Sequence, residues 1–186
     1  MDVLTLKSLQ TQWACQISER LQKSAPSCLW TIGNREILAV HKIGLFCSVS
    51  CPDDANLAVQ DSVRKLREDG ATVISGFHSP MEKECLRILL EGKQSVIICL
   101  AHSLGKIRLP AEWRKALESN RLLLLSRFEK PRRADKETVR RRNELVAALS
   151  DEVLIIHAEP GGSVERISEL IARWHIPLRR QTPDGA

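Results

Sequence analysis

Short apolar segments alternate with amphipathic helical patterns along most of this 186-residue chain. This alternation constrains the fold more than any other feature. From residue 43 onward, apolar runs typical of strands lie at 43–49, 71–75, 94–100, 121–126 and 152–157. Helical patterns fill the intervals, one ending at residue 68 and the others at 79–91, 111–119, 134–150 and 163–174. Short apolar strands joined by helices of about three turns predict a parallel sheet with helices on both faces.

The first 34 residues follow a different pattern. Residues 4–24 place apolar side chains at helical spacing and predict one amphipathic helix, and residues 29–34 predict a short strand and turn. We therefore expect an α/β fold with a parallel sheet of about five to six strands, preceded by an N-terminal helix. The expected organisation is a helical extension at 1–28, one α/β domain at 29–180 and a flexible tail at 181–186.

Composition excludes several classes of protein. No run of about 18 apolar residues is present, so we expect no membrane span. The first residues lack the basic and apolar regions of a secretory signal. Among six cysteines only Cys47 and Cys51 are closely spaced, and no neighbouring pair or histidine completes a zinc site. We expect a cytoplasmic protein with free thiols, no metal and no cofactor.

Basic charge is concentrated in one segment. Residues 127–142 hold eight basic and three acidic side chains, a surplus of five that equals the net charge of the whole chain. Such a concentration is typical of a surface that binds a polyanion, although a solvated loop and helix face would show the same pattern. The side chains expected to contact a nucleic-acid backbone are Arg127, Lys130, Arg132 and Arg133.

Ligands of parallel α/β sheets bind outside the carboxyl ends of the strands, so the segments after each strand hold the candidate site. Ser48 lies at the end of the run at 43–49, and no G-x-G-x-x-G motif of NAD-type enzymes occurs there. After the next strand, Ser75, Gly76 and His78 precede the sequence Ser79-Pro80-Met81-Glu82. That sequence predicts a capping box, with Pro80 as the first residue of a helix.

An arginine falls on the buried side of the helix expected at 134–150. On a helical wheel, Arg142 lies in the middle of the apolar arc and Asn143 at its edge. A core-facing arginine is costly unless its head reaches an anion or a carboxylate. The next strand leads into Gly161-Gly162-Ser163 and a helix, where glycines let a backbone approach a phosphate. We predict that Arg142 extends toward the loops at 75–76 and 161–163 and binds an anion there.

Several segments, in order, resemble the DNA-processing protein A (DprA/Smf) family. Residues 142–150, Arg-Asn-Glu-Leu-Val-Ala-Ala-Leu-Ser, resemble its R-N-R-I-I-A-G-L-S motif. Weaker similarities lie at 29–34, 74–78, 124–128 and 161–164. The similarity spans about residues 29–178. It implies a Rossmann-like core that binds single-stranded DNA, forms a homodimer and helps to load a RecA-type recombinase during natural transformation.

The chain departs from this family at Val49, where a basic residue is usual, and at Glu82 and Leu86, where an aspartate and a histidine are usual. A second relative in the superfamily is the LOG-type group of nucleoside-monophosphate phosphoribohydrolases. Arg142-Asn143, Asp151 and Pro160-Gly161-Gly162 resemble its motif, but Val164-Glu165 replaces Gly-Thr. No general base is evident, so we expect a binding protein without catalytic residues. The alternatives are that enzyme and a ligand-free interaction scaffold.

Overall fold

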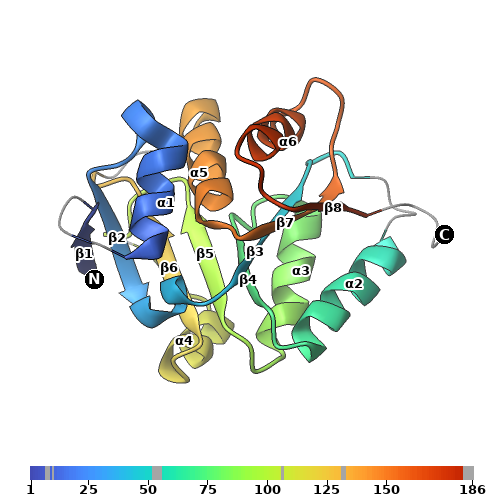
Figure 1. The fold of residues 1–186 in the computed structure, drawn as a ribbon. Helices are drawn as coiled ribbons and strands as arrows, with labels where there is room; N and C mark the ends of the chain where they lie inside the picture. Colours follow the sequence, from blue (N-terminus) through green and yellow to red (C-terminus); the bar gives the residue numbers. More distant parts are fainter. Residues whose placement is uncertain (7–8, 10, 52–55, 106, 131–132, 182–186) are drawn as a thin grey trace.

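The computed structural model describes residues 1–6, 9, 11–51, 56–105, 107–130 and 133–181. These residues form one sheet of eight strands in the order β1-β2-β6-β5-β4-β3-β7-β8 (Figure 1). The strands are β1 (Asp2–Thr5), β2 (Cys28–Gly33), β3 (Lys42–Cys47), β4 (Thr72–Ser75), β5 (Val96–Leu100), β6 (Leu122–Ser126), β7 (Glu152–His157) and β8 (Leu178–Arg180).

Six of these eight described strands are parallel, from β6 across the sheet to β8. The other two are antiparallel, because β2 pairs with β6 and β1 pairs with β2. The predicted α/β class with helices on both faces is confirmed. The expected count of five to six strands is too low, because the two short edge strands β1 and β8 were not predicted. The sheet is mixed because β1 and β2 pair in antiparallel fashion.

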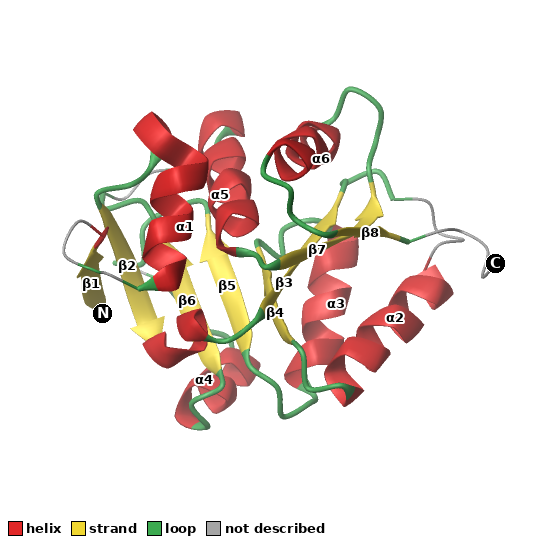
Figure 2. Ribbon diagram, in the orientation of Figure 1, coloured by secondary structure: helices red, strands yellow, loops and turns green. Residues whose placement is uncertain are grey.

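The helices cover both faces of the sheet (Figure 2). One face packs against the first helix and the last two, and the opposite face packs against the three helices between them. The first group is α1 (Gln12–Leu21), α5 (Lys136–Leu149) and α6 (Ser163–Arg173), and the second is α2 (Asn56–Glu68), α3 (Pro80–Leu90) and α4 (Ala111–Glu118). Two 3-10 helices, η2 (Gln22–Ser24) and η3 (Arg35–Ala39), flank β2.

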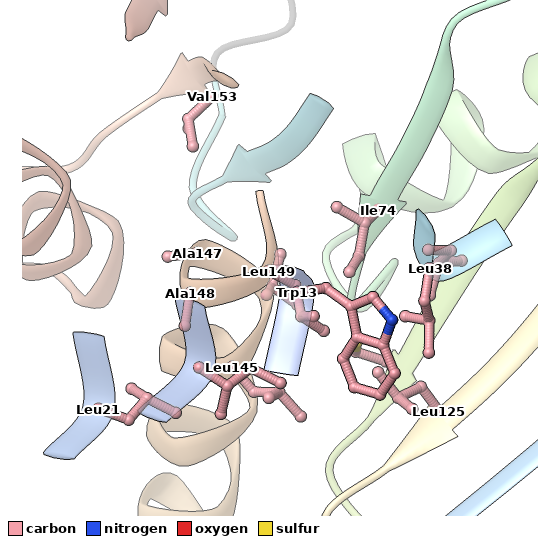
Figure 3. Packing of buried hydrophobic residues seen from close by; sticks show 14 of the residues in the cluster. Trp13, Leu21, Leu38, Ile74, Leu125, Leu145, Ala147, Ala148, Leu149 and Val153 are labelled. Carbon is pink, nitrogen blue, oxygen red and sulfur yellow. The ribbon is translucent and has the colours of Figure 1, made fainter. Parts of the chain in front are cut away.

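The central strands are buried because helices lie on both sides of them. Every residue of β3, β4 and β6 is buried, which explains their nearly continuous apolar sequences. On the α1 side, Trp13 belongs to the same buried cluster as Leu38, Leu125 and Leu145 (Figure 3). This cluster joins α1 to α5 and to the sheet.

The N-terminal segment differs from the helix predicted at 4–24. Residues Asp2–Thr5 form β1, and the α-helix covers only Gln12–Leu21. The helix start predicted from the spacing of apolar residues is wrong, because pairing with β2 determines the conformation of residues 2–5. Trp13 and Ile17 of α1 share their core with residues beyond position 28, so one core spans the expected boundary between the extension and the domain.

The C-terminal edge of the sheet is β8, a three-residue strand that was not predicted. Gln181 continues its pairing, since its backbone N–H donates to the carbonyl oxygen of Ile155 at 2.9 Å. Apart from Gln181, the tail expected at 181–186 lies outside the described residues.

Candidate functional site

The order of the strands reverses direction between β3 and β7. The chain runs outward from β3 through β4, β5 and β6, and then returns to place β7 on the other side of β3. In open parallel sheets, ligands bind in the crevice outside the carboxyl ends of the strands at such a reversal. The loops that follow β3, β4 and β7 therefore border the candidate site.

The loops after β3 and β7 are joined by hydrogen bonds. The backbone N–H of Ser48 donates to the carbonyl oxygen of His157, and the Ser48 hydroxyl oxygen accepts from the N–H of Glu159, each at 3.0 Å. The Ser50 hydroxyl also donates to Oε2 of Glu159 at 3.2 Å. Ser48 thus has a structural role in this arrangement, in addition to the phosphate contact predicted for it.

The glycine pair before α6 also uses its backbone donors within the protein. The N–H of Gly161 donates to Oε2 of Glu165 at 2.6 Å, and the N–H of Gly162 donates to the carbonyl oxygen of Glu159 at 2.9 Å. Ser163 is exposed at the first position of α6. The two N–H groups expected to receive a phosphate therefore already have acceptors.

The carboxylate of Glu82 connects the loops after β3 and β4. Its Oε1 accepts from the N–H of Cys47 at 3.1 Å, and its Oε2 accepts from the N–H groups of His78 at 2.7 Å and Ser79 at 3.3 Å. The Ser79 hydroxyl accepts from the N–H of Glu82, so the predicted capping box with Pro80 at the start of α3 is confirmed. The bond to Cys47 was not foreseen.

The loop after β4 contains an unusual backbone conformation. Phe77 is buried and has a φ of 46°, a left-handed conformation that is uncommon for a bulky side chain. Its N–H donates to the Ser75 hydroxyl oxygen at 3.3 Å, which fixes the turn. Backbone strain of this kind clusters at functional sites. The turn places His78 at the surface and leaves Gly76 beneath α5.

Arg142 extends from α5 onto this loop. A Cβ atom built on Gly76 would lie 1.6 Å from Nη1 and 2.0 Å from Cζ of Arg142, so the guanidinium occupies the space that a side chain would take. Arg142 is only 5% exposed. The contact with Gly76 agrees with the predicted approach to the loop at 75–76. No described hydrogen bond joins the Arg142 side chain to residues 161–163, the second loop of that prediction.

The guanidinium of Arg142 is incompletely paired. Its Nε donates to Oδ1 of Asn143 at 2.7 Å, whereas Nη1 and Nη2 have no acceptor among the residues that the structure describes. Among the described residues, the fully buried side-chain atoms that lack a hydrogen-bond partner are Gln94 Oε1 and Arg121 Nη1. The unpaired Nη atoms of Arg142 are not in this group, so they retain contact with solvent. The largely buried guanidinium therefore presents N–H donors that an anion could reach.

Charge around Arg142 is also unbalanced. Burial lowers the pKa of Arg142, and the negative charge of Glu82 opposes this effect from beyond ion-pair distance. Two carboxylates, one just before β7 and one in the loop after it, are engaged elsewhere: Asp151 with Lys42 at 3.0 Å, and Glu159 with Ser50. A phosphate is the ligand that suits this guanidinium, because it accepts two parallel hydrogen bonds and supplies the missing charge.

The basic segment lies beside the site. Arg127 follows β6 and donates to the carbonyl oxygens of Ser24 at 2.6 Å and Arg141 at 3.2 Å. Lys130 and Arg133 are exposed, as a contact with a nucleic-acid backbone requires. Arg132 lies outside the described residues.

Part of the surplus of positive charge on α5 is neutralised within the helix. Glu137 accepts from Arg140 and Arg141 at 2.7 Å, and Arg140 also pairs with Glu144. Of the three consecutive arginines, Arg142 is therefore the one that lacks a carboxylate partner in the described chain.

A recess beside Arg127 was not recognised from the sequence. It has a volume of about 360 Å³ and lies between the segment 23–28, the residues after β6 and the middle of α5. Trp30 and Phe128 contribute to its wall. No sequence pattern relates residues 23–28 to residues 127–144, because the fold alone brings them together.

Two further observations concern membrane-spanning helices and metal sites. No described helix has the length and apolar character needed to cross a membrane. Across the described ranges, no three His, Cys, Asp or Glu side chains gather as metal ligands.

The fold is similar to two solved structures of DNA processing protein A. The Helicobacter pylori protein, described for its single-stranded DNA binding mode, has a TM-score of 0.76 and 22% identity over 97% of this chain and 80% of that chain. The Streptococcus pneumoniae protein has a TM-score of 0.78 and 17% identity, over 96% of this chain and 62% of that chain. At these identities, the similarity establishes the fold alone.

No curated protein sequence matches the chain. The model of one family, described as DNA recombination-mediator protein A, matches residues 5–169. This match covers most of the chain, including β3 to β7 and the Arg142 site. The chain therefore belongs to the DNA recombination-mediator protein A family.

Proposed function

We propose that this protein binds single-stranded DNA, with Arg142 as the central phosphate contact. Membership of the family and the single-stranded DNA binding described for the Helicobacter pylori relative support this ligand. The observation that carries the proposal is the buried Arg142 guanidinium, whose Nη atoms have no acceptor in the described chain. A guanidinium held in this way gains most from an anion with several acceptor oxygens.

An extended polyanion fits the surroundings better than a single nucleotide. Arg127 lies near the Arg142 helix, and Lys130 and Arg133 are exposed on the loop that leads into it. Phosphates spaced along a strand would contact several of these side chains, each contact releasing counterions. We propose that Ser75, Gly76, His78 and Asn143 shape the phosphate site around Arg142, and that the loop from Gly161 to Ser163 borders it.

The wider biological role follows from the family. We propose that the protein acts in the cytoplasm as a homodimer, in DNA recombination or natural transformation, with a RecA-type recombinase as partner. Each of these points rests on the resemblance to the family and not on a contact in the structure.

The site gives little support to phosphoribohydrolase chemistry. Both carboxylate oxygens of Glu82 accept backbone N–H groups, and Oε2 of Glu165 accepts from Gly161. These two carboxylates are therefore engaged in holding loops, whereas hydrolysis needs a carboxylate within reach of a substrate proton.

Fluorescence anisotropy of a labelled oligothymidylate tests the proposal. The wild-type protein should bind at low salt, and the logarithm of its affinity should fall linearly with the logarithm of salt concentration, by about 0.7 for each phosphate contacted. Thymidine monophosphate should compete only weakly. Absence of binding at low salt would exclude the DNA ligand, and equal competition by the mononucleotide would point to a small nucleotide instead.

A further inference from the structure

The recess beside Arg127 is separate from the Arg142 site. Its wall includes the segment from Lys23 to Cys28, which joins α1 to β2, and Arg140, Arg141 and Glu144 of α5. Arg142 itself does not line it. Figure 1 shows α1 and α5 side by side, and the recess lies between the segment that follows α1 and the middle of α5. The volume of about 360 Å³ falls within the range of small-ligand pockets, roughly 300–1,000 Å³.

The charge of the recess is positive. Four cations line it, Lys23, Arg127, Arg140 and Arg141, against one carboxylate, Glu144. Glu144 pairs with Arg140, so it does not neutralise the others.

Two of these cations have no carboxylate partner. Arg127 is bonded to two backbone carbonyl oxygens and to no carboxylate of the described chain. The Lys23 side chain is exposed, and no ion pair joins it to a carboxylate of the described chain. Burial and the neighbouring charges of Arg141 and Arg140 lower the pKa of Arg127, and Glu144 and Glu137 oppose this shift.

Two aromatic side chains occur in the same wall. Trp30 on β2 and Phe128 after β6 are both partly buried and line the recess. The chain has only seven aromatic residues, so two in one basic pocket are a notable concentration. Aromatic surfaces beside cations are the combination that proteins use for single strands, because bases stack on the rings while cations contact phosphates.

We propose that this recess holds one nucleotide of a bound single strand, with its base against Trp30 or Phe128 and its phosphate beside Lys23 and Arg127. The inference rests on the proposed function and extends it to a second subsite. Because Arg141 lines the recess and Arg142 is the next residue, the strand would cross the first half of α5 between the two subsites. The width of a helix, roughly 10–12 Å, is a distance that a few nucleotides can span.

Two variants and a matched control test the subsite. Phe128→Leu keeps an apolar side chain but removes the ring, and Lys23→Gln removes an exposed charge without breaking a described bond. Lys115→Gln removes the same charge from the exposed surface of α4, which lies at the opposite end of the molecule from the recess in Figure 1. Affinity for an oligothymidylate should fall at least about 5-fold in Phe128→Leu. The salt slope should decrease by about 0.7 in Lys23→Gln, and Lys115→Gln should match the wild type.

A thymidine dinucleotide provides a second readout, because it is too short to reach both subsites. Under the proposal, Arg142→Gln weakens both ligands, whereas the two recess variants weaken the long strand more than the dinucleotide. Photo-crosslinking of an oligonucleotide that contains 4-thiothymidine should label the peptide that holds Trp30 or Phe128, even if Phe128→Leu folds poorly.

The outcomes separate the two proposals. Binding that depends on Arg142 but not on Lys23 or Phe128, with no crosslink at the recess, would overturn the subsite and leave the proposed function intact. Absence of any binding by the wild-type chain would overturn both.

Discussion

The guanidinium of Arg142 occupies the place of a side chain at Gly76, with Nη1 only 1.6 Å from where a Cβ atom would lie. Glycine is required there by this close approach and not by backbone conformation, since the φ of Gly76 is not positive. The two residues, on α5 and on the loop after β4, therefore act as one unit.

Substitution of Gly76 should reveal this coupling. Gly76→Ala should lower the free energy of unfolding by about 1–3 kcal/mol, because the added methyl group displaces a buried guanidinium. In an Arg142→Gln background the same change should cost less, giving a coupling of roughly 0.5 kcal/mol or more in a denaturation cycle. Gly105→Ala is the control, because a Cβ there meets nothing within 4 Å. Strictly additive costs would show that the two residues do not share this space.

Loss of Arg142 should affect stability little. The only hydrogen bond of its side chain to a described residue is to Asn143, and it has no carboxylate partner in the described chain, so Arg142→Gln leaves no buried charge unpaired. We expect a change of under about 1.5 kcal/mol in urea denaturation. A loss of several kcal/mol would mean that Arg142 is an internal strut and not a ligand-binding side chain.

The ion pair between Lys42 and Asp151 should dominate stability instead. Lys42 is buried, and its Nζ donates to Oδ2 of Asp151 at 3.0 Å and to the carbonyl oxygens of Leu38 and Val40. Asp151→Ala leaves the ammonium without its carboxylate and should cost about 3–5 kcal/mol. Asp61→Ala, which breaks an exposed pair with Arg64, should cost under about 1 kcal/mol. Similar losses in both variants would contradict this ranking.

The ion pair between Lys42 and Asp151 should also make the free energy of unfolding depend on pH in the acidic range. Burial opposes ionisation of Asp151, but hydrogen bonds from Lys42 and its charge outweigh burial and hold the pKa of Asp151 below its ordinary value. A lowered carboxylate pKa contributes stability that is fully present above the unfolded-state pKa of about 3.9 and is lost as pH falls through the lower folded-state value. Between about pH 5 and pH 2, the stability of Asp151→Asn should therefore decline less steeply than that of the wild type. Parallel pH profiles would exclude this contribution.

Glu82 should stabilise the loops around the candidate site. Glu82→Ala leaves the backbone N–H groups of Cys47, His78 and Ser79 without their acceptor, and each unsatisfied donor costs about 1–3 kcal/mol when buried. We expect a loss of roughly 3 kcal/mol in thermal or urea denaturation. Glu84→Ala, on the same helix but in a surface pair with Arg87, should change stability by under about 1 kcal/mol. An equally small effect of Glu82→Ala would show that water replaces the carboxylate.

The sequence predicted those parts of the fold whose burial leaves a pattern. β3 to β7 are apolar runs because helices cover both faces, and the capping box at Ser79 is a local signal. β1 has four residues and β8 has three, and most of them are exposed. These strands form by pairing with a neighbouring strand, so their sequences contain no apolar run from which they could be predicted.

The candidate site could be predicted only where the pattern of apolar residues on one helix face revealed it. Arg142 stood out because a charge interrupted an apolar arc. The bond from Cys47 to Glu82 and the pair between Lys42 and Asp151 join residues 35 and 109 positions apart, and neither has a periodic pattern. The hydrogen bonds of the Gly161 and Gly162 N–H groups could not be predicted either, because the positions of their acceptors depend on the folded loop.

The affinity of Arg142→Gln for single-stranded oligothymidylate, measured by anisotropy at one low salt concentration, tests the central claim most directly. Arg173→Gln removes the same charge from the exposed end of α6 and serves as the control. We predict that Arg142→Gln loses at least about 10-fold in affinity, the equivalent of one charge-assisted contact of about 1.4 kcal/mol or more, while Arg173→Gln binds like the wild type. Wild-type affinity in a folded Arg142→Gln protein would contradict the claim that this guanidinium holds a phosphate.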